Sequence, residues 1–89
     1  MIEIIKPNGE VEAHEGHISF KEIQKLVEGF VQMVTITENG KVTQVCCNED
    51  GLLMGLNRNV MAEGRFKRHI NISQAVGTWV VLTGKSRIS

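Results

Sequence analysis

The sequence predicts an α+β fold: one small domain with a mixed or antiparallel sheet of about five strands, a main helix across one face and a short second helix. Three observations predict it. Residues 19–30 carry apolar side chains at helical spacing, two β-rich runs flank Asn39-Gly40, and residues 77–83 are almost continuously apolar. A chain of 89 residues has the length of one domain, so we expect a single domain over 1–89.

The first 16 residues predict a hairpin. Residues 1–5 are mostly apolar, and Pro7-Asn8-Gly9 is a typical turn sequence. Residues 10–13 then alternate acidic with apolar side chains, as a returning strand with one solvated face does. Acidic side chains discourage further pairing, so we expect this second strand at an edge of the sheet.

The main helix is predicted over about 19–30. Ser19 and Glu22 have the spacing of a capping box, and Ile18 with Ile23 that of a hydrophobic staple. Gly29 weakens the last turn, so the helix ends there or a few residues later. The side chains expected on the buried face are Phe20, Ile23, Leu26, Val27 and Phe30.

The second half of the chain is predicted to be a hairpin, a short helix and a closing strand. Residues 31–37 and 42–48 flank the Asn-Gly turn, and a short helix begins at about Asn57. Residues 65–69 read as a basic loop that Phe66 tethers. Residues 77–83 are expected as a central strand buried on both faces, and residues 85–89 as a frayed tail.

The two halves of the chain carry opposite net charges. Residues 1–50 hold four lysines against nine acids, and residues 51–89 hold six basic residues against one acid, so the halves carry −5 and +5. They either form two surfaces or interleave in the fold.

The chain has neither an 18-residue apolar run nor a basic leader, so we expect no membrane span and a cytoplasmic location. Adjacent Cys46 and Cys47 are expected to be reduced and on opposite faces of a strand.

The sequence contains no recognisable catalytic motif. It has no phosphate-binding loop, no nucleophile elbow and no zinc-protease helix. His14 and His17 are either solvated loop residues or half of a metal site, and a cysteine nucleophile would need a nearby base and a lowered pKa. We therefore expect no enzyme, no catalytic residue, no metal and no cofactor.

A segment rich in Asn and basic residues is the candidate binding site. Arginine forks and asparagine amides suit phosphate, carboxylate or base edges, and a helix capped by Asn57 would add backbone amides. The segment therefore predicts a site for an anionic ligand such as a nucleotide, or for nucleic acid; the alternative is an ordinary solvated loop. The candidate residues are Asn57, Arg58, Asn59, Arg65, Lys67 and Arg68.

Four stretches carry a resemblance to a known family. They are SFKEIQKLVEGFVQMV, VCCNEDG, GLNRN and VGTWVVLTG, which together span about residues 18–84. The chain resembles a family of small proteins of unknown function from bacteriophages and plasmids. It departs from the family's pattern by lacking a proline before Asn59 and by carrying the basic loop 65–69. The resemblance implies a mobile-element origin and no known activity, catalytic residue or cofactor.

These observations together favour a binding protein. The leading hypothesis is a non-enzymatic phage or mobile-element accessory protein that binds a host macromolecule, for host takeover or anti-defence, in the host cytoplasm. The alternatives are a binder of a small anionic ligand through residues 57–69, and a nucleic-acid-binding protein. A small domain with an open sheet edge is also expected to form a homodimer.

Overall fold

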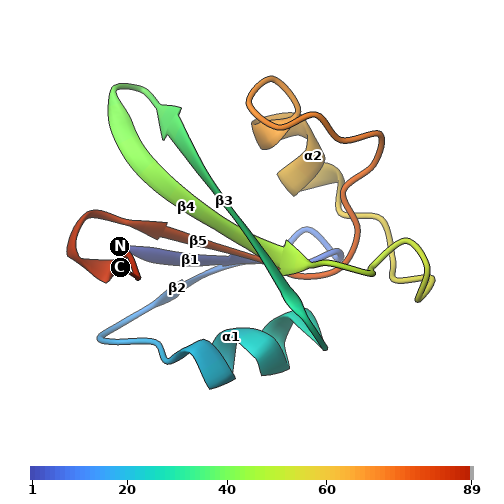
Figure 1. The fold of residues 1–89 in the computed structure, drawn as a ribbon, viewed down its shortest axis with the longest axis horizontal. Coiled ribbons are helices and arrows are strands. Elements are labelled where there is room, and N and C mark those ends of the chain that lie inside the picture. Colours follow the sequence, from blue (N-terminus) through green and yellow to red (C-terminus); the bar gives the residue numbers. More distant parts are fainter. Residues whose placement is uncertain (89) are drawn as a thin grey trace.

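The protein is an antiparallel five-stranded sheet with one helix on each face (Figure 1). This computed structural model describes residues 1–88 and confirms the predicted α+β class. The elements are β1 (Ile2–Ile5), β2 (Val11–His14), α1 (Phe20–Val27), β3 (Val31–Glu38), β4 (Lys41–Asn48), α2 (Val60–Phe66), β5 (Trp79–Thr83) and the 3-10 turn η1 (Gly84–Ser86).

The strand order is β2-β1-β5-β4-β3, and every neighbouring pair is antiparallel. The last strand, β5, is therefore central, as its apolar sequence predicts, and β2 is an edge. The other edge is β3, the outer strand of the Asn39-Gly40 hairpin. Because β5 lies between β1 and β4, the acidic and basic halves of the chain interleave in the sheet.

Alternation along β5 divides the interior into two cores. Val80 and Leu82 face α1, where they pack with Ile23 and Val27. Trp79 and Val81 face α2. A strand that is buried on both faces needs apolar side chains at every position, which is why the sequence of β5 does not alternate.

The N-terminus of α1 forms as predicted. The Ser19 hydroxyl accepts from the Glu22 amide at 3.1 Å, and the Glu22 carboxylate accepts from the Ser19 amide at 3.2 Å. The predicted C-terminus at about residue 30 is wrong, because Glu28 adopts left-handed backbone with φ 65° and ends the helix at Val27. Phe30 consequently lies outside the helix and is 70% exposed, so its predicted place in the core is also wrong.

The second helix begins three residues later than predicted. The Asn59 side chain, not that of Asn57, caps it by accepting from the Ala62 amide at 3.1 Å. Residues 65 and 66 belong to its last turn rather than to a loop, and Phe66 is fully buried rather than a surface tether.

The C-terminal residues that the structure describes are not frayed. The Gln44 amide oxygen accepts from the backbone amide of Ile88 at 2.6 Å, and the Gln44 side-chain nitrogen donates to the Ile88 carbonyl. The prediction of a frayed tail is therefore wrong for residues 85–88. Ser89 lies outside the described residues.

Candidate functional site

Asn59, one of the six candidate ligand residues, is a buried structural side chain. It is 0% exposed, and its side-chain nitrogen donates to the Ile5 carbonyl at 2.9 Å and the Gly77 carbonyl at 2.8 Å. Its side-chain oxygen caps α2, and its backbone amide donates to the Ala75 carbonyl at 2.7 Å. Asn59 thus joins β1, α2 and the segment before β5, and no hydrogen-bonding group of its side chain is left for a ligand.

Arg65, a second candidate, forms a bridge between two strands. From α2 it donates to both carboxylate oxygens of Glu38 at 3.0 and 2.8 Å, and to Glu3 at 3.1 Å. Its guanidinium also lies 4.9 Å from the centre of the Phe66 ring. Bidentate bonds between an arginine and a carboxylate are among the stronger hydrogen bonds in proteins. Arg65 therefore links α2 to β1 through Glu3 and to β3 through Glu38.

This bridge makes stability depend on pH. Its hydrogen bonds with Arg65 lower the pKa of Glu38 below the ordinary value of 4.5. A carboxylate with a lowered folded-state pKa stabilises the fold above its unfolded pKa, and this contribution is lost as the pH falls through the folded pKa. We therefore expect Glu38→Gln to lower the thermal midpoint at pH 7. At pH 3 the difference from wild type should be much smaller, as differential scanning calorimetry can measure. An equal difference at both pH values would contradict this role.

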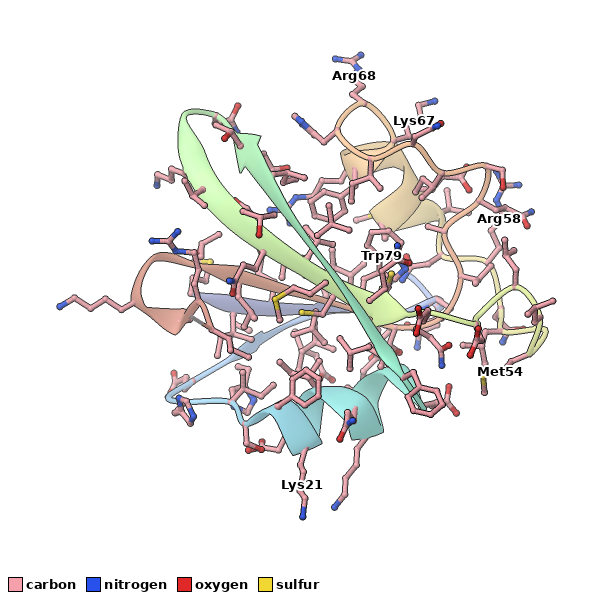
Figure 2. The ribbon with its side chains drawn as sticks, in the orientation of Figure 1. Lys21, Met54, Arg58, Lys67, Arg68 and Trp79 are labelled. Carbon is pink, nitrogen blue, oxygen red and sulfur yellow. The ribbon has the colours of Figure 1, made fainter. Side chains whose placement is uncertain are left out.

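The remaining candidate residues are Asn57, Arg58, Lys67 and Arg68. Arg58 forms a bidentate pair with Glu63, with a shortest distance of 2.6 Å. Lys67 and Arg68 are exposed beyond the end of α2, and Figure 2 shows Arg68 pointing away from the body. The Asn57 side chain is exposed, while its carbonyl accepts from the Gly77 amide at 2.8 Å. Within residues 1–88 the six side chains do not line a common pocket.

The cysteines and histidines show no features of a reactive centre. Burial raises the pKa of the Cys46 and Cys47 thiols to about 11, opposite to the shift that a nucleophile needs. The side chain of His14 has its Nε2 atom 3.3 Å from the His17 carbonyl oxygen. Residues 1–88 contain no group of three or more side chains placed to hold a metal ion.

An exposed apolar surface forms at one end of the molecule. It comprises Phe30, Leu52, Leu53 and Met54, which are 70%, 56%, 90% and 53% exposed, and we call it the apolar end. The start of β3 and the turn after β4 meet there (Figure 1), where the Glu49 amide donates to the Phe30 carbonyl at 2.8 Å. Figure 2 shows Met54 projecting from this end. The helical spacing of residues 19–30 predicts a buried Phe30, and no sequence pattern marks residues 52–54, so this surface was not predicted.

A hollow of about 350 Å³ lies beside the apolar end. Leu52 and Leu53 form part of its wall, Trp79 and Cys47 come from the sheet, and Glu49 and Asp50 add carboxylates from the turn. The hollow therefore combines apolar walls with negative charge.

Two glycines hold the turn in place. A Cβ atom on Gly51 would lie 2.7 Å from the Val76 side chain, and one on Gly77 would lie 2.9 Å from that of Leu56. Gly77 also has a φ of 75°, which disfavours other residues. Residues 51–56 therefore pack closely against residues 76–77, and this contact positions the apolar end.

Asn48 ties the same turn to the end of α1. Its side-chain nitrogen donates to the Val27 carbonyl at 2.8 Å and lies 3.5 Å from the Met54 sulfur, while its side-chain oxygen accepts from the Asp50 amide. The stretches that carry the family resemblance thus converge in space: the end of α1, the CNEDG turn, the GLNRN segment and the start of β5.

The model of the family described as domain of unknown function DUF3846 matches residues 2–87. The chain belongs to this family. No curated protein and no solved structure shows a significant match to the chain. Among residues 1–88 of this DUF3846 chain, no helix is both long and apolar enough to cross a membrane.

Proposed function

We propose that this protein is a non-enzymatic accessory protein that binds another protein through the apolar end. The observation that carries the proposal is the exposure of four large apolar side chains, Phe30 and Leu52 to Met54, on one surface. Water-exposed apolar side chains that adjoin one another are costly unless a partner covers them, and such patches mark interaction sites.

The chemistry of this end indicates the kind of partner. A single apolar side chain of the partner can enter the hollow next to Leu53, while Glu49 and Asp50 attract a neighbouring Lys or Arg. The partner surface that fits is therefore an apolar anchor flanked by positive charge.

The basic segment supports a nucleotide or nucleic-acid function less well. Asn59, Arg58 and Arg65 already bond to groups of their own chain. Lys67 and Arg68 remain as an exposed cationic pair, and two phosphate contacts supply little of the affinity that nucleic-acid binding needs.

We infer the biological setting from the resemblance to phage and plasmid proteins. In it, the protein acts in the cytoplasm of the host cell, and its partner is a host protein that it inhibits or redirects, in host takeover or anti-defence. The proposal includes no cofactor and no catalytic step.

The test is site-directed photo-crosslinking in host cells, with the reactive amino acid at Leu53. Any crosslinked protein is then purified, and its affinity is measured for wild type and for Leu53→Ser/Met54→Ser. We expect binding to weaken at least 30-fold, about the effect of losing one interface hot spot. The double variant Val11→Ser/Val42→Ser is the matched control, because both valines are about half exposed and lie on other surfaces.

Three outcomes would contradict the proposal. The first is equal loss of affinity in the control variant. The second is unchanged affinity in the Leu53/Met54 variant. The third is that the purified protein retains nucleic acid, that salt releases this nucleic acid, and that Lys67→Ala/Arg68→Ala abolishes the retention. This outcome would favour the basic surface instead.

A further inference from the structure

Among residues 1–88, no strand pairs with the outer edge of β3, and four residues of β3 face outward along it. The Phe30 carbonyl accepts from the Glu49 amide at 2.8 Å, and the register pairs residue 31 with 48 onward to 38 with 41. Because hydrogen-bonded pairs alternate in antiparallel strands, the even-numbered residues of β3 bond to β4. Val31, Met33, Thr35 and Thr37 therefore turn their backbone N–H and C=O groups away from the sheet.

This edge lacks the protection that β2 has. The strand β2 is four residues long and carries Glu12, which pairs with Lys6 at 2.9 Å. By contrast, β3 is eight residues long, and its only charged residue is Glu38, at its last position. It contains no proline, and natural proteins rarely leave so long and uncharged an edge open unless it pairs with another strand.

We propose that β3 pairs with β3 of a second copy of this chain, about a two-fold axis at Val34, to form a continuous ten-stranded sheet. This register sets Val31 opposite Thr37 and Met33 opposite Thr35 of the other copy, so all four outward residues of each copy find partners. Up to eight backbone hydrogen bonds form, and Val34 faces its own symmetry mate.

The side chains fit this register. Met33, Thr35 and Thr37 lie on the same face of the sheet as α1, where their side chains are exposed. Pairs of apolar and β-branched residues stabilise neighbouring strands. No like charges face each other, because Glu38 lies opposite Phe30 of the other copy. A two-fold interface needs this self-complementarity. The inference rests on the edge of β3 and not on Leu52, Leu53 or Met54; of the apolar end, only Phe30 lies beside this interface.

The test is sedimentation equilibrium of the full-length protein over a concentration series. A contact of one strand with another is small beside the standard interface of about 1,600 Å², so we expect dissociation at about 1–100 μM. Met33→Lys/Thr35→Lys sets lysines opposite each other twice and should weaken dimerisation at least 10-fold. Met33→Lys/Thr35→Glu sets each lysine opposite a glutamate and should restore the dimer at low salt. Both variants change exposed side chains, and circular dichroism checks that the monomer stays folded.

Several results would overturn the inference. Wild type that stays monomeric up to about 1 mM excludes a specific dimer. A dimer that survives the double-lysine variant, or that the Lys/Glu variant fails to restore, pairs in another way. A dimer lost in Leu53→Ser/Met54→Ser forms through the apolar end, so the same series distinguishes failure of this inference from failure of the proposed function.

Discussion

Replacement of Asn59 with alanine is expected to lower the free energy of unfolding by roughly 3–5 kcal/mol. The change leaves the buried Gly77 carbonyl and the Ala62 amide without their side-chain partner. It also removes one donor from the Ile5 carbonyl, which keeps its ladder bond to Trp79. An unsatisfied buried group costs about 1–3 kcal/mol, and the lost helix cap adds about 1 kcal/mol. A fall of this size is a large part of the stability of a domain of this length, roughly 5–10 kcal/mol.

Urea denaturation followed by circular dichroism measures this effect. The matched control is Asn57→Ala, two residues earlier, because the Asn57 side chain is exposed and only its backbone is used. The control should change the unfolding free energy by no more than about 0.5 kcal/mol. If the two variants were equally stable, Asn59 would not hold β1, α2 and β5 together.

Replacement of Phe66 with alanine is expected to cost roughly 3–5 kcal/mol, the range for a large aromatic residue in a core. Phe66 is fully buried and stacks on Trp79, with ring centres 5.7 Å apart. Removal of the ring opens a cavity between α2 and the sheet. Trp79 is the single tryptophan, so a red shift of its fluorescence reports the entry of water.

The chain supplies its own control for this prediction. Phe30→Ala removes the same side chain from a site that is 70% exposed, and it should cost less than about 1 kcal/mol. It should leave the Trp79 emission unchanged. Equal costs for the two variants would mean that α2 does not pack on the sheet as described.

Sequence reasoning succeeded where the signal was local or strongly periodic. The capping box at Ser19, the Asn39-Gly40 turn and the continuous apolar run of β5 each depend on a few neighbouring residues, and the structure confirms all three. The capping box and the Asn-Gly turn form because adjacent backbone groups and side chains satisfy one another within one or two turns. Strand β5 instead bonds to β1 and β4, and it was predictable because a strand buried on both faces is apolar at every position.

The candidate site could not be read in the same way. Asn57 and Asn59 are equally good caps by sequence, and only the carbonyls of Ile5 and Gly77 select Asn59. Arg65 looks like a free cation until Glu3 and Glu38, 62 and 27 residues away, are brought beside it. Phe30 fits the helical spacing of α1, but Glu28 ends the helix before that residue is reached.

The sequence by itself therefore determined the fold class, the two hairpins and the start of the main helix, because these follow from local hydrogen bonding and hydrophobic periodicity. The tertiary structure decided which polar side chains are buried and which apolar side chains are left exposed. In the folded chain, the side chains of Asn59 and Arg65 bond to groups of the chain itself, whereas the apolar end and the β3 edge are exposed. The physical reason is that burial and charge pairing depend on residues distant in sequence, whose positions are set only when the sheet forms.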